Sequence, residues 1–547
     1  MKHLFFKFNK YTFPCVVFSF LFGLTLIFVQ KVIITNGIFS TNDEAYIISI
    51  NFFDIIKLFV YSALTYCFLL ILETVTNRIQ ILNAYKERVT NIKLFFALML
   101  ILLICWLPCL LTFYPGGIYS DTVISLAMAN GTSALNNHNP ILYTLSWQAV
   151  LSLAHILNQS EYLGLFMYTC FQSLAMAATG AYFLYSLYKK GFSKGLIILS
   201  LAYLGLFNII PLYLVSLWKD TPFAIIVFLF STFLFNIFWN EDNENKLFSR
   251  SSIFIYCFLS YLLAFARNNG FYVFVLFSVI IVIYFAHRKV KKLFYYSLVL
   301  SIILISTFSI IRGPIYSYLH YNNDDIVESL GIPIQQIAYV IANDGNVSDA
   351  DLEYVNSIIP IDNLKNEYHP MIVDRLKWSQ DFHKEALDGN VKDFAKTYAS
   401  IIFKNPSLAL KGFLLANEGF WDPTSQTSDG YVCNYMWPGI SYEMQNKVQQ
   451  WFGFSLSNDY TTSVKYSSAF FAWLVFGTTV LGFKRRHGGS YIPLIPALGI
   501  WLTMLIATPL AFSLRYMFPL VLLIPLGIAN MCAPKYNNTE VSTAVEI

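Results

Sequence analysis

Hydrophobic stretches long enough to cross a bilayer recur along this chain, and most of them are separated by short polar segments. A membrane-spanning helix needs about 20 mostly apolar residues. On this basis the pattern predicts twelve transmembrane helices, at residues 13–34, 52–73, 93–113, 162–187, 194–216, 221–239, 252–266, 270–287, 293–311, 467–483, 490–511 and 514–532. The chain is therefore predicted to be an all-α polytopic membrane protein.

Composition supports this interpretation and excludes other classes. Of the 547 residues, 56% are hydrophobic and 12% are charged, whereas soluble domains carry roughly 25% charged residues. The net charge of +4 is small, and most Lys and Arg residues lie in short loops beside hydrophobic runs. That distribution is typical of membrane topology, so we expect membrane lipids and not nucleic acid as partners. All cysteines except Cys433 lie in or at the end of apolar runs, which favours neither a disulfide framework nor a zinc site.

The Lys- and Arg-rich short loops orient the predicted helices, because cytoplasmic loops are enriched in these residues. This rule places both termini in the cytoplasm of a multi-pass plasma membrane protein. The apolar run from Ile141 to Leu157 would place Lys189, Lys190 and Lys194 outside if it were counted as a span. It is therefore predicted to be a helix in the outer interface of the membrane.

The same pattern predicts how the chain is divided. A Gly/Pro-broken helix pair at matching positions in two halves, which would indicate a transporter, is not found in the sequence. The predicted parts are two N-terminal helices with a cytoplasmic loop (1–92), a transmembrane core (93–311) with a first external loop (114–161), a mostly helical extracytoplasmic domain (312–466), C-terminal helices (467–532) and a disordered cytoplasmic tail (533–547).

Four separated polar strings fall at the outer ends of predicted helices. Charged groups close to hydrocarbon are costly unless they are paired or face water, so their confinement to one face predicts a shared cavity. Two carboxylates and three cations there could bind a phosphate and activate an acceptor hydroxyl. The strings contain Asp121 with His138, Lys219 with Asp220, Arg267 with Asn268 and Asn269, and Arg515 with Tyr516.

Each candidate also has a structural interpretation. Asp121 is a candidate general base, or an N-cap of the helix that follows it. His138 could orient a phosphate or a hydroxyl, or only begin the interfacial helix. Lys219 and the neighbouring aspartate could form a local ion pair at a helix start, and Arg267 could extend to the lipid headgroups. Arg515, in the turn between the last two predicted spans, is interpreted as a phosphate clamp.

This arrangement resembles that of the GT-C glycosyltransferases, membrane enzymes that use a polyprenyl-phosphate-linked sugar as donor. The similarity extends from about Tyr114 to Pro519. More closely, the chain resembles an uncharacterised family of large membrane proteins in Gram-positive bacteria that is grouped with this superfamily, through the motifs YPGG, SDT, NHNP, KDTPF, RNNG, GIPIQQIAYV and GFWDP.

In that superfamily an acidic residue lies in the first large external loop, which matches Asp121. A second acidic residue at the outer end of a later helix pair matches Asp220, and an Arg-Tyr string before the last helices matches Arg515–Tyr516. The HP-type motif that opens a juxtamembrane helix matches His138–Tyr143, although Asn139 stands where a proline is often found.

The resemblance implies an inverting transfer of a sugar to a cell-envelope acceptor. Asp121 would be the base, and Asp220 would assist with the acceptor or a metal. A divalent metal is possible, but two carboxylates without a third ligand are a weak basis for a dedicated site. Alternatives are a transporter or flippase, and a polymerase or ligase, of lipid-linked saccharides. The residues expected to contact the substrates are His138, Lys219, Arg267, Asn268, Arg515 and Tyr516.

Overall fold

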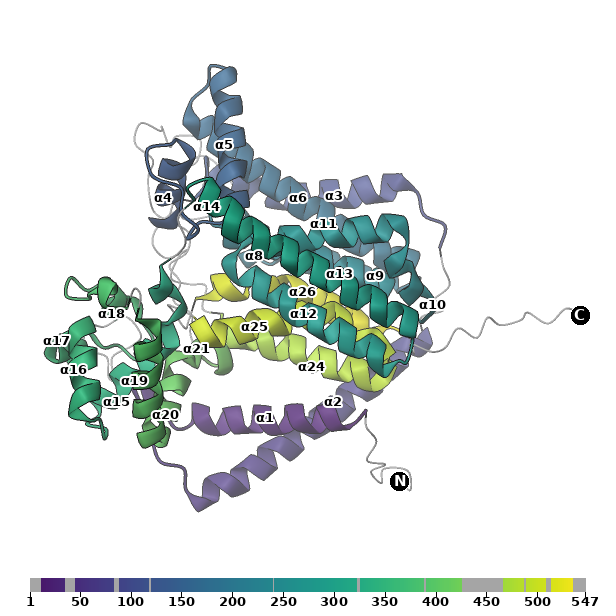
Figure 1. The fold of residues 1–547 in the computed structure, drawn as a ribbon. Coiled ribbons are helices and arrows are strands. Elements are labelled where there is room, and N and C mark those ends of the chain that lie inside the picture. Colours follow the sequence, from purple (N-terminus) through teal and green to yellow (C-terminus); the bar gives the residue numbers. More distant parts are fainter. Residues whose placement is uncertain are drawn as a thin grey trace, which may run out of the picture.

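A computed structural model describes residues 11–34, 45–82, 88–117, 120–239, 241–321, 325–387, 390–425, 466–486, 488–507 and 513–534. The described part is almost entirely helical, with one short antiparallel hairpin (Figure 1). The predicted C-terminal tail lies almost wholly outside the described residues, as does the segment from 426 to 465.

The elements of the first half are α1 (Phe13–Val29), β1 (Val32–Ile34), β2 (Ala45–Ile47), α2 (Phe52–Leu82), α3 (Ile92–Thr112), α4 (Ser120–Ala129), α5 (Ile141–Ile156), α6 (Glu161–Lys189), α7 (Lys194–Leu206), α8 (Ile209–Val215), α9 (Asp220–Ile237), α10 (Glu241–Glu244), η1 (Asn245–Phe248), α11 (Arg250–Ala266) and α12 (Asn268–His287).

Those of the second half are α13 (Lys291–Ile310), η2 (Ile311–Ile315), α14 (Tyr316–Tyr318), η3 (Ile326–Ser329), α15 (Gly331–Ala342), α16 (Asp349–Ile358), α17 (Ile361–Glu367), α18 (Asp374–Lys377), η4 (Lys384–Ala386), α19 (Val391–Lys404), α20 (Pro406–Ala416), α21 (Glu418–Trp421), α24 (Ser468–Arg486), η5 (Gly488–Leu494), α25 (Ile495–Ala507), η6 (Leu514–Met517) and α26 (Phe518–Cys532).

Every stretch predicted to span the membrane contains helix, but one of them also contains a strand and another contains a bend. The first helix ends at Val29, and residues 32–34 form β1. The stretch 194–216 is two helices, α7 and α8, bent by 46° at a break of two residues. Seven helices among the described residues are long and apolar enough to cross a membrane, or eight if that pair is one span. The chain is thus an all-α, multi-pass membrane protein, and twelve spans stay a prediction.

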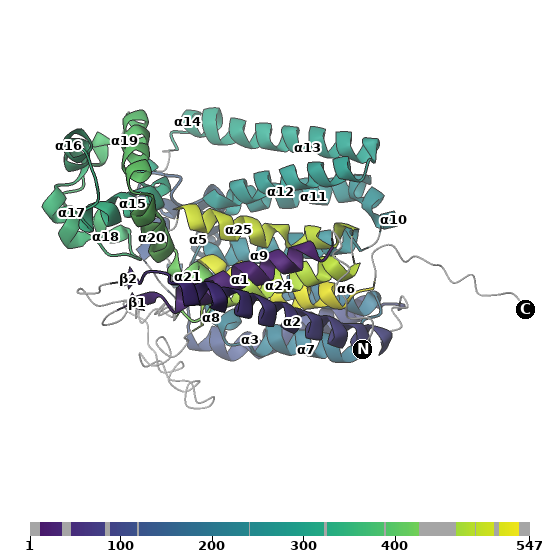
Figure 2. The same ribbon diagram turned by 90° about the horizontal axis from the view of Figure 1, so that it is seen from below.

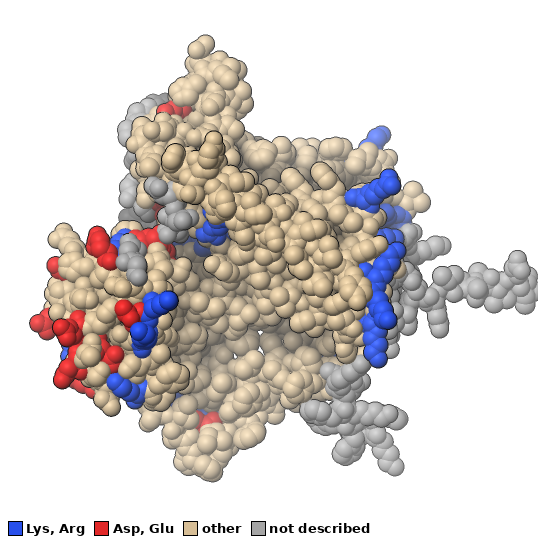
Figure 3. Space-filling view, viewed as in Figure 1, with Lys and Arg blue, Asp and Glu red and all other residues tan. Residues whose placement is uncertain are grey.

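The apolar helices form a bundle whose members run side by side (Figure 2). At its centre lie α9 and α26, in whose apolar stretches 78% and 89% of the residues are buried, against 6% in α2. Lys and Arg side chains form a band at one end of the bundle, near α10 (Figure 3). At the other end, Asp and Glu gather on a unit of short helices, α15 to α20 (Figures 2 and 3).

Two further elements lie at the end of the bundle opposite the band of Lys and Arg (Figures 1 and 2). Helix α5 packs against α4 and α6 and runs steeply across the direction of α11 and α13 (Figure 1), an orientation expected of an interfacial helix. The hairpin β1–β2 reaches the unit of short helices, where Ile47 packs against Tyr339 and Leu415. The N-terminal helix pair is therefore in contact with the unit formed by α15 to α20.

A buried acidic pair lies where this unit joins the bundle. Glu418 in α21 is only 3% exposed and accepts a hydrogen bond of 2.7 Å from the hydroxyl of Ser425. Burial and the adjacent charge of Asp422 raise the pKa of Glu418 to about 8. Glu418 is consequently protonated at neutral pH.

Replacing Glu418 with Gln is expected to flatten the pH dependence of stability. In the folded state Glu418 keeps its proton up to about pH 8, whereas in the unfolded chain it keeps the proton only up to about pH 4.5. Its contribution to the free energy of unfolding is therefore complete below the pKa of the unfolded chain and is lost as the pH rises through the pKa of the folded state. Thermal unfolding midpoints of the detergent-solubilised protein between pH 5 and 9 should fall more steeply for the wild type. Glu353→Gln, at an exposed position of α16, is the control; equal slopes for wild type and Glu418→Gln would contradict the assignment.

Candidate functional site

The loop after α3 is joined by backbone hydrogen bonds to the segment that precedes α9. The amide of Gly117 donates to the carbonyl of Val215 (2.8 Å), and its own carbonyl accepts from the amide of Leu217 (3.1 Å). Gly116 has φ +142°, and an added Cβ would lie 2.9 Å from atoms of Leu217 and Thr169. The close approach of these two chain segments therefore requires glycine.

The carbonyl oxygen of Leu217 ties three elements together. It accepts hydrogen bonds from the hydroxyls of Thr122 in α4 (2.8 Å) and Tyr143 in α5 (2.6 Å). Because Asp121 precedes Thr122 and Lys219 follows two residues after this carbonyl, the same bonds hold both charged residues close together. Asp121 lies in the first turn of α4, so it is not the N-cap residue of that helix.

Asp121 lies between two cations. Its Oδ2 atom is 3.4 Å from Nη1 of Arg515 and 3.9 Å from Nζ of Lys219. Burial raises the pKa of Asp121, but the positive charges of Lys219 and Arg515, with those of His138 and Arg267, lower it further and bring it to about 2. The carboxylate is therefore ionised at neutral pH, and its side chain is 21% exposed.

A second ion pair lies beside the first. Asp220, the first residue of α9, pairs with Arg267, which follows the last residue of α11. Their side chains are 1% and 11% exposed. The ring of Tyr516 joins the two pairs, because the guanidinium groups of Arg267 and Arg515 lie 4.9 and 4.7 Å from its centroid. Arg515 also donates a hydrogen bond of 2.7 Å to the Tyr516 hydroxyl.

The loop before α5 closes the site on one side. Nζ of Lys219 donates to the carbonyl of His138 (3.0 Å) and to the side-chain oxygen of Asn139 (3.4 Å). The side-chain amide of Asn268 donates to the carbonyl of Asn137 (2.8 Å). This loop is thus held by the residue that precedes α9 and by the first residue of α12.

These contacts decide between several of the interpretations drawn from sequence. Lys219 pairs with Asp121 and not with its neighbour Asp220, so the local ion pair is wrong. Arg267 is engaged by Asp220, so its interpretation as an arginine extended to the headgroups is also wrong. One cluster, the ion-pair cluster, contains Asp121, Lys219, Asp220, Arg267, Arg515 and Tyr516.

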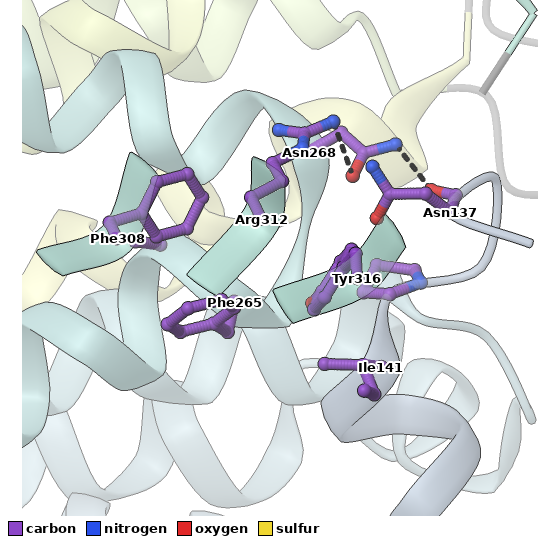
Figure 4. Close-up of a pocket in the computed structure, with 9 residues that line it drawn as sticks. Asn137, Ile141, Phe265, Asn268, Phe308, Arg312 and Tyr316 are labelled. Carbon is purple, nitrogen blue, oxygen red and sulfur yellow. Dashed lines mark hydrogen bonds between the residues drawn. The ribbon is translucent and has the colours of Figure 1, made fainter. Parts of the chain in front are cut away.

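The other two predicted residues are placed differently. His138 meets the ion-pair cluster through its carbonyl oxygen, and its imidazole is near enough to influence Asp121. Asn268 is directed toward Asn137 and Arg312 instead (Figure 4). Sequence reasoning missed Trp218, whose ring lies 5.3 Å from the Arg515 guanidinium. The signal available in the sequence was the position of this aromatic residue directly before the candidate Lys219.

The residues present do not fit a dedicated divalent metal site. Such sites for hard cations use several oxygen ligands, whereas Asp121 and Asp220 are each already paired with a side-chain cation. Within the described ranges, no three His, Cys, Asp or Glu residues are grouped so that they could hold an ion. Asp220 is therefore better understood as the partner of Arg267 than as a metal ligand.

Comparisons with known proteins give a family but no relative of known activity. Neither a curated protein nor a solved structure matches this chain. Residues 126–544 match a family described as a family of unknown function, DUF6020. The match begins five residues after Asp121 and includes Lys219, Asp220, Arg267 and Arg515. Because it covers most of the sequence, this chain belongs to the DUF6020 family.

Proposed function

We propose that this protein is a GT-C-type glycosyltransferase that transfers a sugar from a polyprenyl-phosphate donor to a cell-envelope acceptor. The observation that carries the proposal is the ion-pair cluster. Its charged residues come from separate segments of the chain and meet at one end of a membrane bundle, where isolated charges are costly. Cations grouped in this way suit a phosphate, and a partly exposed carboxylate suits an acceptor hydroxyl.

The proposed topology has twelve spans in the plasma membrane, both termini in the cytoplasm, and the ion-pair cluster at the extracytoplasmic face. It is supported by the band of Lys and Arg at the opposite end of the bundle (Figure 3), since such bands are typical of the cytoplasmic side. At the end of the bundle that carries this band, basic residues lie in the last turns of α6 and α24 and in the first turn of α13.

In the proposed reaction the acceptor hydroxyl attacks the anomeric carbon of the sugar from the face opposite the phosphate. The new C–O bond forms as the bond to the phosphate oxygen breaks, and the configuration inverts. Arg515 and Lys219 stabilise the negative charge that develops on the departing lipid phosphate. The proton of the hydroxyl passes to the carboxylate of Asp121.

The low pKa of Asp121 bears on this role, because a base works best when its pKa is near the operating pH. A carboxylate with a pKa of about 2 is a weak base. A donor phosphate would compete with Asp121 for Lys219 and Arg515, and weaker contacts to these cations would raise the pKa of Asp121. On this proposal the donor itself makes Asp121 a stronger base.

The test uses the purified full-length protein and a cell-envelope extract as acceptor. A polyprenyl-monophosphate sugar should lose its sugar to the extract and release polyprenyl phosphate. Transfer only from a diphosphate-linked oligosaccharide would instead favour a polymerase or ligase. Release from neither donor would contradict the proposal.

A flippase for lipid-linked saccharides is the second candidate. The bend between α7 and α8 favours it, since broken helices are typical of transporters. In proteoliposomes, movement of the labelled donor between leaflets without sugar transfer would support the flippase and overturn the transferase.

A further inference from the structure

A further cation lies at the outer end of the bundle, outside the ion-pair cluster. Helix α13 has 20 residues and is thus about 30 Å long, the thickness of the hydrocarbon core. Arg312 follows two residues later, in the π-helical turn η2, which contains Pro314. Single π-helical turns are frequent at functional sites. Arg312 is therefore positioned at the level where α13 leaves the membrane core.

The guanidinium of Arg312 is held by neutral groups. It donates to the side-chain oxygen of Asn268 (3.4 Å; Figure 4). The side-chain amide of Asn137 lies against the same guanidinium, and with its oxygen turned toward Arg312 it accepts from Nη2 (2.6 Å) and Nε (2.9 Å). Among the described residues, no carboxylate pairs with this half-buried arginine. A cation in that environment favours an anionic ligand.

A pocket opens beside this arginine. Arg312, Asn137 and Asn268 form its polar end, and the rings of Phe265 and Phe308 lie among its apolar walls (Figure 4). The space between the lining residues is about 190 Å³ with its open mouth, but its enclosed part has room for only about one water, so a bound headgroup would lie mainly in the mouth. The pocket combines a planar guanidinium, which matches phosphate geometry, with apolar walls from the adjacent ends of α11 and α13.

We propose that this pocket binds the phosphate headgroup of a lipid, with the alkyl chain lying along α11 and α13. The apolar walls favour a lipid over free phosphate. On α11, Phe258 and Phe254 lie two and three turns before Phe265 on the same helix face, are 53% and 73% exposed, and continue the apolar surface toward the membrane core. The assignment does not depend on the proposed function, because it uses neither Asp121 nor Arg515.

The site is separate from the ion-pair cluster but adjacent to it through two chain connections. Asn137 directly precedes His138, and Asn268 directly follows Arg267. A lipid headgroup on Arg312 would therefore contact the side-chain amides of Asn137 and Asn268. Asn268 is next to Arg267 of the ion-pair cluster, and Asn137 is next to His138, whose carbonyl accepts a hydrogen bond from Lys219.

The test is photocrosslinking of the full-length protein in maltoside micelles with an alkyl phosphate that carries a diazirine in its chain. Labelled peptides mapped by mass spectrometry should include the ends of α11 and α13. Arg312→Gln is expected to lower this labelling by at least about tenfold, the effect of losing one charge-assisted contact. Arg312→Lys should retain most of it, and Arg250→Gln, at the opposite end of α11, should retain all of it.

Two comparisons in the wild-type protein test the inference without relying on a variant that folds. The matching alkyl alcohol should label these peptides much less than the phosphate, and excess inorganic phosphate should not compete. Equal labelling by the alcohol, or competition by inorganic phosphate, would overturn the lipid-phosphate assignment. Labelling that is lost in Arg515→Gln and kept in Arg312→Gln would also overturn it, yet would leave the proposed function standing.

Discussion

Replacing Asp121 with Asn is expected to lower the rate of sugar transfer from a polyprenyl-phosphate donor by about 10²- to 10⁴-fold, the usual contribution of a positioned acid or base. Asn has nearly the same shape but cannot accept the hydroxyl proton. It also leaves Lys219 and Arg515 without the carboxylate that lies 3.9 and 3.4 Å from them. The measurement is the initial rate of product formation by protein of verified membrane insertion.

Two further variants give this experiment its controls. Asp344→Asn removes a carboxylate whose side chain is 88% exposed in the unit of short helices, and transfer should continue at the wild-type rate. Arg515→Ala should weaken donor binding by about one to two orders of magnitude. If Asp121→Asn and Arg515→Ala, made separately, both left transfer unaffected, the enzyme hypothesis would fail.

The second large effect is on stability, at the Asp220–Arg267 pair. Asp220→Asn is expected to lower the free energy of unfolding by about 3–5 kcal/mol, because removing one partner of a buried ion pair leaves the other charge uncompensated. Both side chains are largely shielded from solvent, at 1% and 11% exposure. Denaturant unfolding in mixed micelles, followed by tryptophan fluorescence, measures the loss.

The matched control for this prediction is Asp393→Asn, which removes the acid of an exposed ion pair with Lys396. Its effect should stay within about 1 kcal/mol. Asp220→Asn combined with Arg267→Gln should recover part of the loss, since no buried charge is then left unpaired. An effect of Asp220→Asn no larger than that of Asp393→Asn would show that this pair contributes little.

The positions of the membrane helices could be predicted from sequence because a spanning helix depends on a local property, an apolar run of sufficient length. Helix α9 begins at Asp220, one residue before the predicted start, and α12 begins two residues before its own. The bend between α7 and α8 was missed, because the residues at the break, Phe207 and Asn208, include neither proline nor glycine.

The sequence could predict which residues gather at the candidate site, but not which of them form ion pairs with each other. Topology brings Asp121, Lys219, Asp220 and Arg267 to one end, and the structure joins them. Their pairing depends on side-chain direction, which changes by about 100° from one helical residue to the next. Lys219 and Asp220 consequently face different partners, as do Arg267 and Asn268. Sequence adjacency therefore gave the wrong ion pair and did not distinguish Asn268, which contacts Asn137 and Arg312, from the members of the ion-pair cluster.

Arg312 was missed for a different reason. Hydropathy ended the ninth predicted span at residue 311, which assigned this arginine to the extracytoplasmic domain. In the structure the helical path continues through η2 into α14, so the arginine still belongs to the bundle. A composition window detects where apolar residues stop, but it does not detect where a helix ends.

The position of Asp121 between Lys219 and Arg515 also has a consequence for turnover. On the proposed function, each cycle ends with a lipid phosphate held by the same two cations. The carboxylate of Asp121 lies close enough to re-form its ion pairs with them, and it competes with the product for their charge. The residue that accepts the proton would thereby promote product release, so that tight binding of the spent lipid carrier does not limit the next cycle.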